Sequence, residues 1–283
     1  MKLSKALLAS FTMLAICGPA QAEDGWRLGV TGGLTQYSGE EDPRFASVSI
    51  ARDFEQGYVQ LAVSMVDGGV TQGVLNAVPV NSETVTLSLG RSFGDVSFDG
   101  YASLGQRRFK PETLPGSRVT INSNGSSLGL GGALTYDADL SDGLILSPFA
   151  ALDYDKVDIG RAILSPGGDV RTVKSKEDGV TGSAGLALQK LFGENGKHSA
   201  GINAAFVATS NSSASRSGTG AQTINRIVGA RNVPGQSDEW AELGASGSFA
   251  IAEKWRLNLN ANRTLGFSGP EATTLTAGLS FRF

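Results

Sequence analysis

The chain has 283 residues, of which 40% are hydrophobic and 18% are charged, and its formal net charge is -3. Its 38 glycines against 9 prolines exclude a collagen-like repeat and a proline-rich disordered chain. A mildly acidic chain without a basic stripe is also a poor candidate for binding DNA or RNA, so we expect no nucleic-acid partner.

The first 22 residues have the features of a secretory signal peptide. Lys2 and Lys5 supply positive charge, an apolar stretch runs from residue 6 to 17, and small residues precede an expected cleavage site after Ala22. About twelve apolar residues are too few for a transmembrane helix, which needs roughly 20. Cleavage would remove the only cysteine, Cys17, so we expect no disulfide or thiol chemistry in the mature protein, residues 23–283.

From Trp26 onward, apolar residues alternate with small or polar residues at a period of two, which is the pattern of β-strands with two different faces. A membrane barrel and a secreted sandwich would both show this period. We count about twelve such segments, which cover residues 26–35, 46–51, 59–65, 85–89, 96–104, 128–136, 144–154, 180–188, 202–208, 241–251, 255–262 and 273–283.

Connector lengths distinguish the two architectures. Short and long connectors alternate along the chain, as periplasmic turns and extracellular loops do in outer-membrane barrels, and a sandwich gives no reason for this alternation. The sequence therefore predicts an all-β fold: a single transmembrane antiparallel β-barrel of about 12 strands, following a cleaved signal peptide, with its long loops outside the cell. The short connectors are 55–56, 94–95, 141–143, 193–197 and 252–254, and the long ones are 70–81, 111–124, 161–177 and 210–236.

Candidate catalytic and binding residues are few. His198, the only histidine, lies beside a predicted periplasmic turn rather than next to a serine at an active-site rim. The carboxylates of residues 153–158, DYDKVD, suit calcium but lack the glycine of an EF-hand loop. The glycine-rich stretch around Gly129 is not followed by the helix of a phosphate-binding loop. We expect no enzyme, no cofactor and no metal site, and calcium binding by the loops stays open.

The chain ends on TAGLSFRF, residues 276–283, with an aromatic side chain on the last residue. This ending resembles the C-terminal signal by which the barrel assembly machinery recognises outer-membrane proteins. The signal has a polar residue, a glycine two positions later, and two aromatic residues separated by one residue, the second of them last. Thr276, Gly278, Phe281 and Phe283 occupy these four places. An edge strand with one apolar side suits strand addition to a receptor sheet, so we expect this machinery to be a partner during insertion.

Length, strand count and this ending together resemble the autotransporter-type translocator barrel of Gram-negative outer membranes, over about all of residues 23–283. Autotransporters carry a passenger and a pore-threading helix before the first strand, whereas cleavage here leaves three residues ahead of Trp26. We therefore expect neither passenger nor pore helix.

The function predicted from these features is a passive narrow diffusion pore for small solutes, or a structural barrel. Two alternatives stay open: a surface adhesin or binding protein that acts through its long loops, and a translocator barrel related to autotransporters. Outer-membrane lipid and lipopolysaccharide are the expected surroundings, because two long loops are basic, with Arg171 and Arg226 among their residues.

The alternation also places charged side chains on the lumen side near the periplasmic mouth. Three arginines lie on the first, eleventh and twelfth strands, which closure of the barrel makes neighbours, and three aspartates lie on the opposite wall. Facing clusters of opposite charge tune solute preference in pores, unless direct salt bridges neutralise them. The candidates are Arg27, Arg256, Arg282, Asp99, Asp137 and Asp139.

Overall fold

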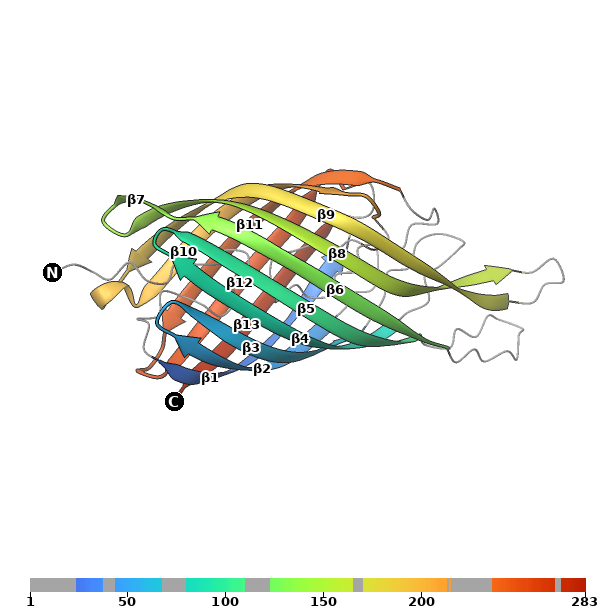
Figure 1. Cartoon of the computed structure of the whole chain (residues 1–283), viewed down its shortest axis with the longest axis horizontal. Coiled ribbons are helices and arrows are strands. Elements are labelled where there is room, and N and C mark those ends of the chain that lie inside the picture. The colour runs from blue at the N-terminus through green and yellow to red at the C-terminus, as the bar shows by residue number, and fades with distance from the viewer. Residues whose placement is uncertain are drawn as a thin grey trace.

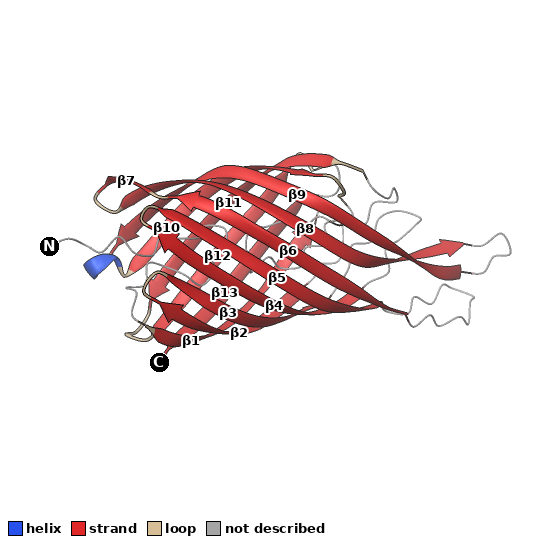
Figure 2. Cartoon of the chain, viewed as in Figure 1, coloured by secondary structure: helices blue, strands red, loops and turns tan. Residues whose placement is uncertain are grey.

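A closed antiparallel β-barrel makes up almost all of the structure, a computed structural model that describes residues 24–37, 44–67, 80–109, 123–164, 170–212, 214, 236–267 and 271–283 (Figure 1). Among these residues the only helix is the short η1, Glu194–Gly196 (Figure 2), and no helix is long and apolar enough to cross a membrane. The predicted signal peptide, residues 1–22, and three of the predicted long connectors lie largely or wholly outside the described residues.

Thirteen strand segments form the wall in the described part of the chain. They are β1 (Gly25–Tyr37), β2 (Arg44–Phe54), β3 (Gly57–Asp67), β4 (Val80–Phe93), β5 (Val96–Phe109), β6 (Ser123–Tyr136), β7 (Ala138–Ser141), β8 (Leu144–Leu164), β9 (Val170–Phe192), β10 (His198–Thr209), β11 (Asp238–Ala250), β12 (Trp255–Leu265) and β13 (Ala272–Arg282).

Two pairings close the sheet. The first strand pairs with the last, β1 with β13, and β6 pairs with β8. β8 also pairs with β7. Because β6 and β7 are consecutive pieces of one strand interrupted at Asp137, the described segments make a barrel of twelve strands. Closure leaves no open sheet edge in contact with lipid. The predicted fold is confirmed.

Each strand separates a polar inner face from an apolar outer face. On β4, Thr84, Thr86 and Ser88 are buried toward the lumen, while the intervening Leu87 and Leu89 are about half exposed on the outside. A side chain that is exposed on the outer wall of a membrane barrel contacts lipid, so the exposed apolar residues form the hydrophobic band.

The two ends of the barrel differ. The tight turns at 55–56, 94–95 and 142–143 lie at the end where β1 begins and β13 finishes, which we call the turn end (Figure 1). We call the opposite end, where β1 finishes and β2 begins, the loop end. Exposed aromatic side chains gather on the outer wall at the turn end, as in the girdle at a membrane interface. They include Trp26, Phe54, Phe93, Phe98, Tyr136, Phe192, Trp255 and Phe283.

The predicted long connector at residues 161–177 is wrong. β8 and β9 continue to pair beyond the rest of the wall as far as Leu164 and Val170, so the connector is only residues 165–169. Figure 1 shows this hairpin projecting from the loop end. The alternation that marks a strand in sequence requires lipid on one side, and it disappears once both faces of a hairpin leave the membrane.

Large side chains on the inner wall lie over glycines of the neighbouring strand. The ring of Tyr101 on β5 covers Gly131 on β6, and the ring of Tyr58 on β3 covers Gly90 on β4. Phe149 lies over Gly185 in the same way. Because a glycine offers no Cβ, each ring packs flat against the wall instead of projecting into the lumen.

We expect Gly131→Ala to destabilise the barrel by about 1–3 kcal/mol, the usual cost of overpacking. The added Cβ would lie 2.5 Å from Cε1 of Tyr101 and would also meet the carboxylate of Asp153. Gly182→Ala is the matched control, because a Cβ there meets only Leu152 Cδ1, at 3.9 Å. Urea unfolding of both variants in the same lipid vesicles would measure the difference, and equal midpoints would contradict this packing.

Candidate functional site

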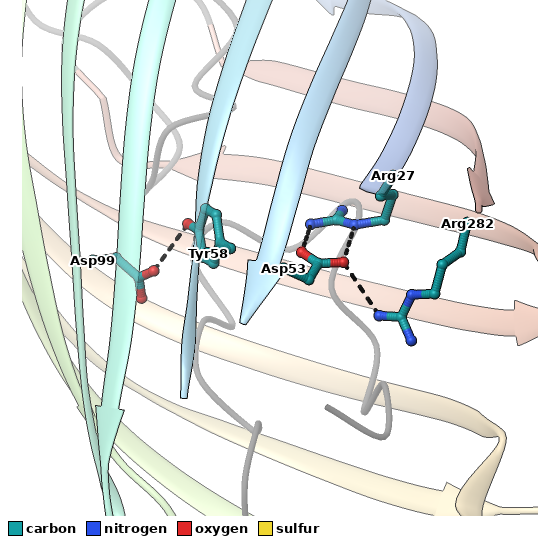
Figure 3. A network of polar contacts seen from close by, with 5 residues as sticks. All are labelled: Arg27, Asp53, Tyr58, Asp99 and Arg282. Atoms are coloured by element: carbon teal, nitrogen blue, oxygen red, sulfur yellow. Dashed lines mark hydrogen bonds and ion pairs between the residues drawn. The ribbon is translucent and has the colours of Figure 1, made fainter. Parts of the chain in front are cut away.

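The turn end of the lumen contains a cluster of charged side chains from the first, second and last strands. Arg27 of β1 donates two hydrogen bonds to Asp53 of β2, from Nε to Oδ2 at 3.1 Å and from Nη2 to Oδ1 at 3.0 Å. Arg282 of β13 donates from Nη2 to Oδ2 of the same carboxylate at 3.2 Å (Figure 3). Asp53 therefore joins the strands on both sides of the closing seam.

Burial and geometry make this cluster a well-ordered ionic contact of the inner wall. Arg27 and Asp53 expose 7% and 6% of their surfaces, and their contact is bidentate. Arg27 and Arg282 are directly opposed in the β1–β13 ladder, where two like charges would repel. The carboxylate of Asp53 between them offsets this repulsion through charge-assisted hydrogen bonds.

Asp53 is a residue that the sequence analysis did not single out. The strand segment expected at residues 46–51 ends three residues before the observed end of β2 at Phe54. Asp53 follows Ser49 and Ala51 on the inward parity, so extending the same alternation by two residues would have placed its carboxylate in the lumen.

The third arginine has different partners. Arg256 of β12 is partly buried and donates from Nη1 to the hydroxyl oxygen of Ser248 on β11 at 2.9 Å. Ser248 in turn donates to Oδ1 of Asn258 at 2.7 Å. Arg256 thus belongs to a polar contact between the neighbouring strands β11 and β12.

The three candidate aspartates lie on the far side from the seam. Asp99 is buried and accepts a hydrogen bond from the hydroxyl of Tyr58 at 3.0 Å (Figure 3). Asp137 lies level with the β4–β5 turn, where its N–H donates to the carbonyl of Asp95. Asp139 is exposed on β7.

The acidic side chains interact electrostatically at this end. Burial raises the pKa of Asp137 to about 6, and the carboxylates of Asp139, Asp95 and Asp99 act in the same direction, while the hydrogen bond from Ser147 opposes them. Asp137 therefore carries only part of a negative charge near pH 6. The aspartates form an acidic group at the turn end, separate from the arginines at the seam.

A second tyrosine repeats the contact made by Tyr58. Tyr101 donates from its hydroxyl to Oδ1 of Asp153 on β8 at 2.8 Å, across the intervening β6. Tyr58 likewise crosses β4 to reach Asp99 on β5. These two contacts tie together strands that are not neighbours in the sheet.

The carboxylates of DYDKVD do not converge. Asp153 and Asp155 are buried on the inner face, whereas Asp158 accepts hydrogen bonds from the N–H and hydroxyl of Ser126 at the exposed outer face. Among the described residues, no group of three or more His, Cys, Asp or Glu side chains could hold a metal ion. The glycine-rich stretch around Gly129 runs through β6.

His198 opens β10 at the turn end and lies between aromatic rings. Its ring centroid is 5.5 Å from that of Phe192 and 6.2 Å from that of Phe249. The histidine belongs to the aromatic girdle rather than to the lumen.

The four residues of the C-terminal pattern divide between the faces of β13. Gly278 is buried on the inner side, with Thr276 on the same parity, and Phe281 and Phe283 lie on the outer side. The terminal residue is paired with the first strand: the N–H of Phe283 donates to the carbonyl of Trp26 at 3.0 Å, and the reverse bond is 3.1 Å. The rings of Phe281 and Phe283 stack at 6.0 Å.

An apolar cluster marks the loop end of the lumen. Val207, Trp240 and Phe267 are buried together, and the rings of Trp240 and Phe267 meet edge to face at 5.1 Å. The indole N–H of Trp240 donates to Glu242, which also accepts from Asn262. The alternation in the sequence does not predict this cluster, because Phe267 lies in a connector.

A closed barrel with an apolar outer band, an aromatic girdle and a polar lumen defines an integral outer-membrane β-barrel protein. The model of the autotransporter β-domain family matches residues 12–262, and the chain belongs to this family.

Solved structures share the fold. The translocator domain of the autotransporter NalP from Neisseria meningitidis superposes with a TM-score of 0.65 at 14% identity, over 92% of this chain and 89% of that one. The β-domain of the Bordetella autotransporter BrkA gives 0.60 at 16% identity, over 91% and 98%. An outer-membrane channel from Pseudomonas putida gives 0.54 at 11% identity, over 92% and 96%. No protein with a curated description matches the sequence.

We expect Asp53→Ala to lower the free energy of unfolding by about 1–3 kcal/mol, because two arginines lose a charged hydrogen-bond partner in a buried place. Glu83→Ala is the control, since the Arg108–Glu83 pair is exposed and contributes less than about 1 kcal/mol. The comparison uses urea unfolding in vesicles, followed by tryptophan fluorescence. A loss at Asp53 no larger than that at Glu83 would show that the cluster does not stabilise the seam.

Proposed function

We propose that this barrel acts as a translocator: it spans the outer membrane and its lumen holds or passes one polypeptide segment. Membership of the autotransporter β-domain family supports this function over the passive pore that the sequence analysis preferred. The structural observation that carries the proposal is the chemistry of the inner wall.

Short polar side chains line the lumen. β4 contributes hydroxyls from Thr84, Thr86 and Ser88, and β12 contributes the amides of Asn258 and Asn260. Thr84, Thr86, Ser88 and Asn258 are buried in the barrel wall, so a segment in the lumen would replace their present contacts. Hydroxyls and amides both donate and accept, so they would then bond to the peptide groups of any sequence. A site for one small molecule would instead combine apolar walls with a few convergent polar groups. The wall therefore suits a polypeptide backbone better than a single ligand.

We also propose that the protein is not an enzyme. The positions of His198 in the aromatic girdle and of the DYDKVD carboxylates on two different faces support this, because neither arrangement joins a nucleophile to a base.

A passive pore is the second candidate, and the charged turn end favours it. The arginines at the seam and the acidic group beyond them would act on any ion that passes. The contact of Arg27 and Arg282 with Asp53 reduces the positive charge available for such selection. The projecting β8–β9 hairpin, in turn, is the feature that would serve a surface adhesin.

The translocator proposal predicts that narrowing the lumen stops display of a fused polypeptide. An epitope-tagged segment would be inserted between Ala22 and Glu23, and its exposure on intact cells measured with antibody. We expect display by the native barrel and its loss in Thr86→Trp/Ala205→Trp, which fills the lumen from two well-separated strands.

The matched control is Leu87→Trp/Ala204→Trp, whose side chains point outward on the same two strands. Equal display by both double variants would contradict passage through the lumen. Absence of display by the native barrel, together with ion conductance in planar bilayers, would favour the pore instead.

We further propose that the barrel assembly machinery recognises the C-terminal strand. Phe283 ends the strand that closes the barrel, and its ring is exposed on the outer face. These features suit strand addition before closure.

Phe283→Ala should reduce the fraction of protein inserted in the outer membrane far more than it reduces the stability of barrels already folded. Phe93→Ala is the control, because Phe93 is another exposed aromatic of the turn-end girdle but is not terminal. Insertion would be followed by the heat-dependent gel mobility of the membrane fraction. Similar losses for both variants would assign Phe283 to the girdle alone.

A further inference from the structure

Two arginines face lipid at the turn end. Arg52 of β2 follows the exposed Ile50 on the outer parity, and Arg91 of β4 follows the exposed Leu89. Each guanidinium lies over aromatic rings of the girdle: Arg52 is 5.6 Å from the ring centroid of Trp26 and 6.0 Å from that of Phe54. Arg91 is 5.0 Å from the ring centroid of Phe93.

Two outward arginines at the loop end, Arg108 and Arg263, have carboxylate partners instead. Arg108 pairs with Glu83 at 3.3 Å, and Arg263 pairs with Glu271 at 2.9 Å. Within the part of the chain that the structure describes, neither Arg52 nor Arg91 forms an ion pair with a carboxylate. Lys190, which is also exposed at the turn end, donates to the carbonyl of Asp142. Arg52 and Arg91 thus place two positive charges on the β2–β4 face of the turn end, each held over an aromatic ring.

Register brings the two arginines into one patch. Trp26 is opposite Arg52 in the β1–β2 ladder, and Gly57 of β3 is opposite both Phe54 and Arg91. Gly57 adds no side chain between them. β2 and β4 are separated by one strand, so the two backbones are roughly 10 Å apart, and long arginine side chains can reach a shared ligand across this distance.

We propose that Arg52 and Arg91 bind the phosphate of an anionic phospholipid in the periplasmic leaflet. The turn end faces the periplasm in barrels with this connectivity, and phospholipids form that leaflet. The aromatic rings hold each guanidinium at headgroup level, which reduces the entropy lost on binding. A guanidinium then offers paired N–H donors to phosphate oxygens.

This site lies outside the lumen and does not depend on the translocator proposal. It also differs from the contact with lipopolysaccharide predicted from basic loop residues. At the loop end Arg108 and Arg263 have carboxylate partners, whereas Arg52 and Arg91 at the turn end lie over aromatic rings and face a leaflet that supplies the anion.

Native mass spectrometry of the full-length protein, purified in detergent, tests the site with two probes: phosphatidylglycerol and phosphatidylcholine. We expect the native protein to retain phosphatidylglycerol preferentially. Arg52→Gln/Arg91→Gln should weaken this retention roughly five-fold for each arginine removed, as expected for a basic residue at an anionic surface. The control Arg108→Gln/Arg263→Gln should keep the preference.

A second variant separates charge from folding. Arg52→Lys/Arg91→Lys keeps both positive charges but lacks the paired N–H donors of a guanidinium, so it should fold even if the glutamine variant does not, with a preference weaker than that of the native protein. Heat-dependent gel mobility would confirm the folded state of each sample. Equal retention of the two lipids by the native protein, or an equal loss of preference in the control, would overturn the proposal.

Discussion

Lipid tails offer no hydrogen-bond partners, so every backbone N–H and C=O that crosses the membrane must be satisfied within the protein. For this chain the requirement is met only when the last strand pairs with the first, from Arg27 opposite Arg282 to Tyr37 opposite Ala272. That pairing places two arginines side by side on the inner wall. Closure therefore creates a need for a negative charge at this place. The register that satisfies the backbone hydrogen bonds also brings two arginines together, and the carboxylate of Asp53 offsets their repulsion.

Closing twelve strands also curves the wall and crowds its inner face. Large inward side chains are accommodated by lying flat over glycines of the next strand, as Tyr58 does at Gly90 and Tyr101 at Gly131. In that position each phenol hydroxyl reaches a carboxylate two strands away. The glycine, the ring and the aspartate form one unit, and each member depends on the others. Aspartates that look like free lumen charges in the sequence are, in the structure, acceptors within the wall.

The fold was predictable because lipid imposes the same alternation on every strand, and a change from Leu87 outside to Thr86 and Ser88 inside is visible without coordinates. The features that were predicted wrongly or not at all are local ones. The β8–β9 hairpin leaves the membrane, loses the alternation and was mistaken for a loop. Asp53 lay just past the end of an expected segment. Contacts such as that of Tyr58 with Asp99 depend on register across an intervening strand, and a single sequence gives the parity of each residue but not which residues are opposed.

Four outward arginines show how the length of a strand beyond the hydrocarbon layer affects the partners of a charged side chain. At the loop end, Arg108 and Arg263 lie where strands rise out of the hydrocarbon, so their side chains reach water and pair loosely with exposed glutamates. At the turn end, β4 finishes only two residues after Arg91, and the tight turn at 94–95 leaves no such extension. A guanidinium there stays at the level of the aromatic girdle. It stacks on the rings because their faces attract a cation that has a flat, weakly hydrated surface. Short turns therefore determine both where the girdle lies and which arginines remain available to an anion from the membrane.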